Sequence, residues 1–326
     1  MLVRGVRIGL CGTDHEINEG YYGSAPPGSD ALVLGHESLG RVVRGGADLP
    51  DGTLVVGIVR RPDGCPNCAR GQQDMCLWGD FTERGIGGLH GFGSEWWVER
   101  PEYVVAIPER LADGGVFLEP LTVVEKVVRH AFRIQGRAHW EPKRALVAGA
   151  GPIGILGAVL LRLGGLAVTV FERTEKPERR ELLARIGAGY AATQATPLDE
   201  IVAGAGPVDM AIEATGNAGV AFTLMQHLGT NGVLGLTSVS GGDATAEVPV
   251  ARVNRGLVLG NKVVFGSVNA NRADFEQGVR DLGEAERRWP GFLATLITAR
   301  VPLADAAPAV THDPRQIKVV VELGGA

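Results

Sequence analysis

Short runs of alternating apolar and polar residues fill the first third of the chain. Strand-like runs stand at residues 1–10 (MLVRGVRIGL), 38–45, 53–60 and 95–108, and Gly and Pro residues separate them. Runs of this length are typical of half-buried strands bounded by turns. The pattern predicts a mostly antiparallel, partly barrel-like β domain in this part of the chain.

The pattern changes after residue 113. Residues 114–134 repeat apolar positions at helical spacing, and residues 144–173 read as a strand, a glycine turn, an apolar helix and a second strand. Such alternation predicts a parallel sheet covered by helices on both faces. Further strands are expected at 208–216, 231–240, 262–269 and 317–323, and a helix at 273–289.

Length and composition restrict the class of protein. The chain of 326 residues is long enough for two domains with separate cores. The net charge of −5 provides no attraction to nucleic acid or to an anionic membrane. No apolar run reaches the roughly 18 residues of a transmembrane helix, and no signal peptide is recognisable. We therefore expect a cytoplasmic protein without nucleic-acid or membrane partners.

A glycine-rich turn follows the first strand of the second pattern. Gly149, Gly151, Pro152, Ile153 and Gly154 belong to the motif GAGPIG, which lies between the strand ALVA and the helix IGILGAVLLRL. A lone GxGxxG arises by chance in a glycine-rich chain. Between a strand and a helix, however, it lets the first helical N–H groups face a pyrophosphate. The motif therefore predicts a dinucleotide site.

The second strand of this pattern ends in an acidic residue. Glu172 lies eighteen residues beyond Gly154, where a carboxylate can accept hydrogen bonds from both adenosine ribose hydroxyls. A solvated surface role is the alternative. The same negative charge would repel the 2′-phosphate of NADP, which favours NAD. Arg173 could instead pair with that phosphate, so both cofactors stay open.

The four cysteines are unevenly distributed. Cys65, Cys68 and Cys76 lie within twelve residues, whereas Cys11 stands alone in the turn GLCGTDHEI. In a cytoplasmic chain such clustering favours metal or redox chemistry over disulfides. Any single cysteine could be a small core residue, but the Cys-Pro-Asn-Cys pair favours metal.

Cys11 has candidate partners elsewhere in the sequence. His36 and Glu37 follow in LGHE, and Glu119 stands in FLEP. A thiolate, an imidazole and one or two carboxylates can form a zinc site with a position left for water or substrate. Individually, these residues could be a turn filler, a core histidine and a helix N-terminal charge. Their combination with a dinucleotide motif favours zinc.

The order of these motifs resembles that of the zinc-dependent medium-chain dehydrogenases, over nearly the whole chain. CGTD, GHE, the cysteine cluster and GAGPIG are shared with the family at large. CPNCARGQQDMC, GGLHGF with EWW behind it, FLEPLTVVEK, IEATG and Val268-Asn269 are similar to its glucose (aldose) 1-dehydrogenase branch. The resemblance implies an α/β fold with a GroES-like, mostly antiparallel catalytic domain and a doubly wound, parallel-sheet Rossmann domain. The expected bounds are 1–115 for the GroES-like domain, 116–270 for the Rossmann domain with its linking helix, and 271–326 for a return to the catalytic domain.

The resemblance assigns metal-binding roles to residues of the first domain. It implies that Cys11, His36 and Glu119 ligate a catalytic zinc ion, and that Glu37 binds it directly or through water. Thr13 corresponds to a hydroxyl relay beside the metal.

The resemblance also implies substrate and cofactor contacts. Glu83 and Asn269 match positions that contact sugar hydroxyls, and His90 and Glu119 are further substrate candidates. The residues expected to bind the cofactor are Gly149, Gly151, Pro152, Ile153, Gly154, Glu172, Arg173, Thr215 and Asn269.

Three features depart from the family pattern. The family usually has further opening strands before its CGTD turn, so we expect that the first strands are missing here. The structural zinc lobe normally has four cysteines, but Pro62 takes the first position. Asp63 could complete a second zinc site with Cys65, Cys68 and Cys76, or the lobe could lack metal. Val123 replaces an acidic residue near the substrate, which leaves the identity of the sugar open.

Together the motifs predict a zinc-dependent oxidoreductase. We expect hydride transfer from C1 of a glucose-like aldose to NAD or NADP, giving the lactone. A dehydrogenase of a polyol, cyclitol or amino sugar in a biosynthetic pathway would use the same chemistry. The metal-ligand set disfavours a zinc-free reductase, and a nucleotide-binding protein with structural zinc only is the non-catalytic alternative. We further expect a homo-oligomer, either a dimer or a tetramer.

Overall fold

The computed structural model describes residues 1–239, 245–311, 313 and 315–324. The chain divides into two compact units: unit 1 is Met1–Thr122 with Asn269–Ala326, and unit 2 is Val123–Val268. The first division falls within helix α2, Leu118–Gln135. Among the described residues, no helix combines the length and the apolar character needed to span a membrane.

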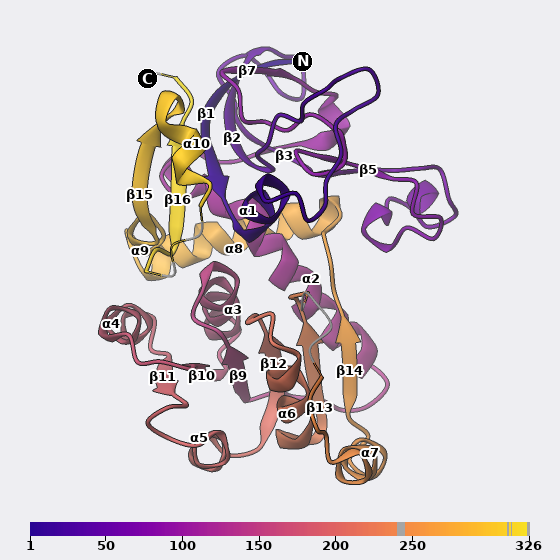
Figure 1. Cartoon of the computed structure of the whole chain (residues 1–326), viewed down its shortest axis with the longest axis vertical. Coiled ribbons are helices and arrows are strands. Elements are labelled where there is room, and N and C mark those ends of the chain that lie inside the picture. The colour runs from indigo at the N-terminus through magenta and orange to yellow at the C-terminus, as the bar shows by residue number, and fades with distance from the viewer. Residues whose placement is uncertain (240–244, 312, 314, 325–326) are drawn as a thin grey trace. The chain divides into compact units, whose positions relative to one another are not determined.

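Unit 1 is built mainly from antiparallel strands (Figure 1). The opening strand β1 pairs antiparallel with β2, β7 and β16, while β15 joins β16 in parallel. Val3 and Ile8 of β1 pack with Phe92 and Trp97 in one buried cluster. The seven-stranded sheet has the order β15 (Ile297–Pro302), β16 (Lys318–Glu322), β1 (Leu2–Leu10), β2 (Glu37–Arg44), β3 (Leu54–Gly57) and β8 (Val104–Ala106), with β7 (Trp96–Val98) on β1.

A second, smaller sheet and several short helices complete unit 1. The three-stranded sheet contains β4 (Arg60–Arg61), β5 (Thr82–Arg84) and β6 (Gly88–Leu89). The helices are α1 (Gly12–Asn18), α8 (Arg272–Arg288), α9 (Phe292–Thr295) and α10 (Ala306–Ala309); the 3-10 turns are η1 (Cys68–Arg70), η2 (Gln73–Met75), η3 (Pro101–Tyr103), η4 (Glu109–Leu111), η5 (Gly115–Phe117) and η6 (Leu303–Asp305).

The strands predicted for this part of the chain are present, with two interruptions. The run at 53–60 divides into β3 and β4. The run at 95–108 divides into β7 and β8, because Pro101 begins the 3-10 turn η3 between them. Proline has no N–H to donate to a strand ladder, so the pairing stops there.

Unit 2 has an all-parallel sheet, as the alternating strands and helices predict. The order β11-β10-β9-β12-β13-β14 is that of a doubly wound sheet, and the predicted α/β class is confirmed. Ser240, the last residue of one predicted strand, lies outside the described residues. The elements are β9 (Arg144–Ala148), α3 (Pro152–Leu163), β10 (Ala167–Glu172), α4 (Pro177–Arg185), β11 (Gly189–Ala192), α5 (Leu198–Ala205), β12 (Val208–Glu213), α6 (Ala218–His227), β13 (Leu228–Leu236), α7 (Val250–Leu259) and β14 (Val263–Gly266).

Helix α3 shows how the sequence specifies this unit. Pro152 occupies the start of the helix, where no intrahelical N–H is needed. The following residues are apolar on nearly all sides, and the whole segment 154–161 is buried. A helix of this kind is stable only against a sheet, and the next strand, β10, contributes Phe171 to the buried cluster of unit 2.

Candidate functional site

Cys11 and His36 meet beyond the ends of two paired strands. Cys11 follows β1 and His36 precedes β2, and the antiparallel register places Gly9 opposite Glu37. A side chain on Gly9 would collide with the Glu37 carboxylate and displace it, so glycine at this position leaves room for Glu37. Sγ of Cys11 lies 3.1 Å from Nε2 of His36, and His36 is buried. The pairing of the strands thus brings together two predicted metal ligands that are far apart in sequence.

Asp14 was not among the predicted site residues, yet it orients both ligands. Its carboxylate accepts hydrogen bonds from the N–H groups of Cys11 (3.1 Å) and Gly35 (3.2 Å), and Oδ1 lies 3.5 Å from Nδ1 of His36. Burial acts to raise the pKa of Asp14, but His36 and these N–H groups lower it overall. The Asp14 carboxylate is too far from Nδ1 for a hydrogen bond, so it favours the ring orientation in which Nε2 faces Cys11 through charge attraction alone. The only signal in the sequence is the spacing of a capping box.

Glu37 lies in the same cluster but has a cationic partner. The Lys318 ammonium donates to both Glu37 carboxylate oxygens, at 2.7 and 2.6 Å, and to the Leu10 carbonyl at 3.2 Å. Burial acts to lower the pKa of Lys318, but Glu37 and Cys11 raise it overall. Lys318 therefore stays protonated and neutralises Glu37. This lysine, in β16, carries no motif that could have identified it.

Glu119 completes the cluster from the start of α2. Burial raises the pKa of Glu119 to about 7, and Glu37 adds to this effect while His36 opposes it. The potential ligand atoms of His36, Glu37 and Glu119 lie within 4.8 Å of one another, as do those of Cys11, Asp14 and His36.

A thiol, an imidazole and carboxylates that converge in this way fit zinc. Thr13 lies in α1, two residues after Cys11.

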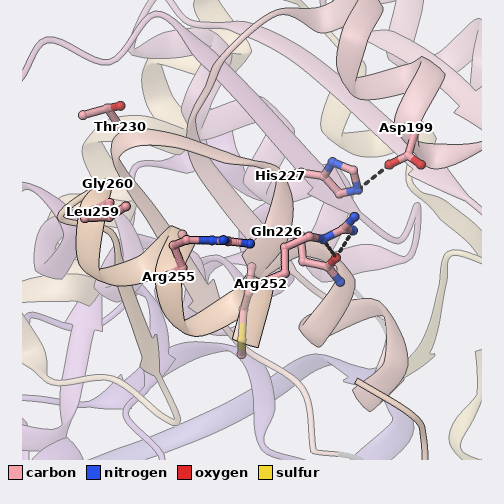
Figure 2. A pocket seen from close by; sticks show the side chains of 10 residues that line it. Asp199, Gln226, His227, Thr230, Arg252, Arg255, Leu259 and Gly260 are labelled. Carbon is pink, nitrogen blue, oxygen red and sulfur yellow. Dashed lines mark hydrogen bonds and ion pairs between the residues drawn. The ribbon is translucent and has the colours of Figure 1, made fainter. Parts of the chain in front are cut away.

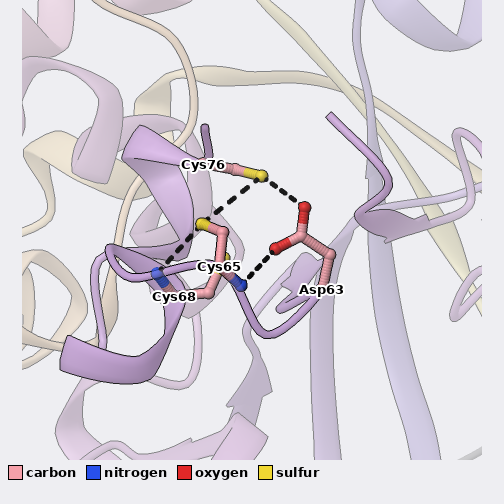
Figure 3. A group of neighbouring side chains, drawn as sticks. All are labelled: Asp63, Cys65, Cys68 and Cys76. Carbon is pink, nitrogen blue, oxygen red and sulfur yellow. Dashed lines mark hydrogen bonds between the residues drawn. The ribbon is translucent and has the colours of Figure 1, made fainter. Parts of the chain in front are cut away.

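A second group of possible metal ligands lies in the cysteine lobe, residues 62–80 (Figure 3). The Asp63 carboxylate accepts hydrogen bonds from the Cys76 thiol (2.7 Å) and the Cys65 N–H (2.9 Å), which lower the pKa of Asp63. Sγ of Cys65 accepts from the N–H groups of Cys68 and Leu77. The four potential ligand atoms of Asp63, Cys65, Cys68 and Cys76 lie within 4.8 Å of one another. This donor set also fits zinc.

The predicted sugar residues Glu83 and Asn269 touch each other within unit 1. Nδ2 of Asn269 donates to Oε1 of Glu83 at 2.7 Å, and Nε of Arg60 donates to the same oxygen at 3.0 Å. His90 is engaged elsewhere, because its Nδ1 accepts a hydrogen bond from the Val33 N–H at 3.2 Å. Arg60 was not predicted; its position opposite Glu83 depends on the pairing of β4 with β5.

The predicted dinucleotide loop has the expected geometry. Gly149 adopts a φ of 99°, in the region that favours glycine. A Cβ on Gly154 would collide with the Gly149 carbonyl, whereas one on Gly151 would point into open space. The loop therefore turns tightly and leaves room beside the start of α3, where N–H groups can receive a phosphate.

The other predicted cofactor residues follow neighbouring strands. The Glu172 carboxylate, at the end of β10, accepts a hydrogen bond from the Tyr190 hydroxyl at 2.7 Å and pairs with the Lys176 ammonium at 2.9 Å. Arg173 is exposed. The Thr215 N–H donates to the buried Glu213 carboxylate at 2.6 Å. Because parallel strands end at one edge of a sheet, the loops after β9, β10 and β12 share that edge.

A surface cavity of about 670 Å³ lies in unit 2 but contains none of the predicted site residues (Figure 2). In it, His227 pairs with Asp199 at 3.1 Å. Burial lowers the pKa of His227, with Arg252 adding to the effect and Asp199 opposing it.

Comparisons with known proteins agree with this architecture. Residues 1–109 match the alcohol dehydrogenase GroES-like domain, and residues 112–323 match the glucose dehydrogenase C-terminus. The glucose 1-dehydrogenase of Methanocella arvoryzae is 44% identical over 99% of this chain and 92% of its own length. The glucose 1-dehydrogenase of Halobacterium salinarum is 40% identical over 99% of this chain and 91% of its own length. Among solved structures, that of Haloferax mediterranei glucose dehydrogenase in complex with NADP, Zn and gluconolactone superposes on this chain with a TM-score of 0.91. The two sequences are 34% identical, and the match covers 100% of this chain and 92% of the other.

A GroES-like unit and a doubly wound unit in one chain define the class of medium-chain dehydrogenases. Within this class, the chain belongs to the zinc-dependent glucose 1-dehydrogenase family, as its motifs predict.

The cysteine lobe generates a prediction about metal content. If Asp63 replaces the missing thiolate, the purified protein should hold about two zinc ions per chain, and Asp63→Ala should lose one. A chelator should also remove the lobe ion more readily than it would from a lobe with four cysteines, because a carboxylate is a weaker zinc ligand than a thiolate. Elemental analysis measures both effects. Asp80→Ala, an exposed residue of the same lobe, should keep both ions; one zinc per chain in the unaltered protein would contradict the prediction.

Proposed function

We propose that the protein oxidises C1 of an aldose such as glucose, with zinc and with NAD or NADP as hydride acceptor, and releases the lactone. The observation that carries this proposal is that two groups of potential ligands, Cys11–Asp14–His36 and His36–Glu37–Glu119, share His36 in a chain that also has a dinucleotide loop. The sequence relatives are glucose 1-dehydrogenases, and the Haloferax mediterranei enzyme is described with NADP, Zn and gluconolactone.

Cys11, His36 and Glu119 would hold the catalytic zinc ion. Asp14 keeps the imidazole of His36 oriented, and Lys318 occupies both oxygens of Glu37. We therefore assign Glu37 to contact through water rather than direct ligation. When bound, zinc supplies a Lewis acid that lowers the pKa of the substrate hydroxyl.

The protein's own groups would handle the proton and the sugar. The Thr13 hydroxyl would take the O1 proton towards solvent, and a bound nicotinamide cofactor would supply the acceptor for the hydrogen that leaves C1 with its electron pair. Loss of these two hydrogens converts the C1–OH group of the cyclic sugar into the lactone carbonyl. Glu83 accepts from ring hydroxyls, and Asn269 and Nε2 of His90 are further polar contacts.

Glu172 supports NAD as the preferred cofactor. Its carboxylate stands at the end of β10, where the adenosine ribose is expected, and repels a 2′-phosphate. Lys176 and Arg173 place cations nearby, so NADP is the second acceptor. Thr215 is assigned to the cofactor because Glu213 fixes its backbone beside the glycine loop.

The decisive experiment is a reduction assay with NAD and NADP over aldoses, polyols and aminocyclitols. Glucose or a related aldose should be the best substrate. Cys11→Ala should lower kcat/KM for it roughly a thousandfold, or about 4 kcal/mol. Binding of NAD, measured by calorimetry, should change little because the dinucleotide loop lies in unit 2. Preference for a polyol or cyclitol would overturn the aldose assignment, and full activity of Cys11→Ala would overturn the zinc site.

Glu172 generates a prediction about cofactor choice. Glu172→Ala should raise KM for NAD roughly thirtyfold, or about 2 kcal/mol, because it removes hydrogen bonds to a charged acceptor. The difference in KM between NAD and NADP should become smaller at the same time. Steady-state kinetics with both cofactors measures this, and Glu175→Ala, an exposed neighbour, is the control. Unchanged constants in Glu172→Ala would mean that the carboxylate has no role in binding.

We also propose that the protein is a cytoplasmic homo-oligomer, a dimer or a tetramer. The four cysteines are free thiols, which suits a reducing compartment. The edge strand β14 (VVFG) contains no charge or proline, and its outer side pairs with no other described strand. An open apolar edge of this kind is a template for pairing with a second copy.

Sedimentation analysis tests the oligomer. The protein should sediment as a multiple of its 34.3 kDa chain mass. Val263→Lys should shift the distribution towards monomer, because it places a charge on the exposed edge. Val43→Lys, on a strand of unit 1, should not. A monomer at all concentrations would contradict the proposal.

A further inference from the structure

The Glu83 carboxylate is held through one of its oxygens. Arg60 and Asn269 both donate to Oε1, at 3.0 and 2.7 Å. The side chains of Arg60 and Glu83 are 6% and 15% exposed, so water competes little with their ion pair. Oε2 accepts no hydrogen bond from the described residues. Two donors on one oxygen fix the orientation of the carboxylate and leave the other oxygen for a ligand.

Arg60 is itself positioned by the cysteine lobe. Its Nη1 donates to the Gln73 carbonyl at 3.4 Å, and its guanidinium stacks 3.6 Å from the centre of the Phe81 ring. Gln73 is the first residue of η2, and this turn ends at Met75, directly before Cys76. A buried guanidinium needs several acceptors in fixed places. The position of Arg60 against Glu83 therefore depends on where the lobe puts Gln73.

A second contact joins the lobe to the segment that carries Asn269. Nδ2 of Asn271 donates to Oδ1 of Asp74 at 3.0 Å, and both residues are buried. The other end of the Asn271 amide accepts from the Ala273 N–H and caps α8. Asn269, two residues earlier, adopts a φ of 59°. Its backbone is thus constrained between its contact with Glu83 and the Asn271–Asp74 hydrogen bond.

The lobe residues that make these two contacts, Gln73 and Asp74, both lie in η2, next to the candidate metal ligand Cys76. Cys76 follows η2 and contacts Asp63, while Asn67 donates to the Met75 carbonyl. A metal ion bound by the thiols of the lobe would therefore order the same turn that presents Gln73 and Asp74.

We propose that Arg60 and the Asp74–Asn271 hydrogen bond are positioning elements. Through them, the cysteine lobe fixes the positions of Glu83 and Asn269. Metal in the lobe then controls affinity for the sugar while taking no part in hydride transfer. This inference rests on the proposed function, since it treats Glu83 and Asn269 as sugar contacts.

Substitution of Arg60 tests the first contact. Arg60→Met should raise KM for glucose roughly tenfold, with kcat and KM for NAD changed less than about twofold. Arg60→Lys keeps the charge and should recover part of the affinity. Arg61→Met is the matched control, because Arg61 lies on the same strand and forms a similarly buried ion pair, but with Glu99. It should lower the unfolding temperature without changing KM for glucose.

Hydrogen exchange provides a readout that needs no substrate. Amides of residues 82–89 should exchange faster in Arg60→Met, and in the unaltered protein after chelator has removed the lobe metal. They should not exchange faster in Arg41→Met, because Arg41 pairs with Glu109, outside this segment. This result would support the coupling even if the protein failed to oxidise glucose, in which case only the sugar assignment would fail.

Two results would overturn the inference. One is glucose oxidation with KM unchanged in Arg60→Met. The other, which applies even if that variant does not fold, is loss of lobe metal from the unaltered protein without any change in exchange at 82–89 or in KM. Either result would leave the proposed function standing.

Discussion

The antiparallel pairing of β1 with β2 is the constraint on which the rest of the candidate metal site depends. Its register places Gly9 against Glu37 and carries Cys11 and His36 to the same point. Asp14 then joins the two strand ends, because one buried carboxylate meets the N–H groups of Cys11 and Gly35 and the ring of His36. A buried carboxylate is stable only with such partners, so these contacts hold or fail together.

Charge compensation divides the carboxylates of this cluster into two kinds. Asp14 and Glu37 have fixed partners, and the pKa of Asp14 is lowered overall although burial acts to raise it. Glu119 is the least compensated, and burial raises its pKa to about 7. A cation placed among these donors would favour the charged form of Glu119.

Under the proposed function, unit 2 would bind a charged cofactor with few charged groups. The loop between β9 and α3 offers backbone N–H groups and lacks side chains at Gly149 and Gly151. Glu172 is the charged exception, and Tyr190 and Lys176 hold its carboxylate at the end of β10. In the proposed cofactor site, cations near Glu172 would weaken the repulsion of a 2′-phosphate.

The sequence by itself determined the fold class and identified most of the residues of the candidate site, because strand periodicity, turn chemistry and the spacing within GAGPIG, CGTD and CPNC are local properties. Tertiary structure alone decided the partners of those residues. Lys318 and Arg60 have no motif, and the contacts of Asp14 with His36, of Lys318 with Glu37 and of Arg60 with Glu83 each join segments separated along the chain. Such contacts depend on strand register and side-chain direction, which are set only when the strands pair and the core packs.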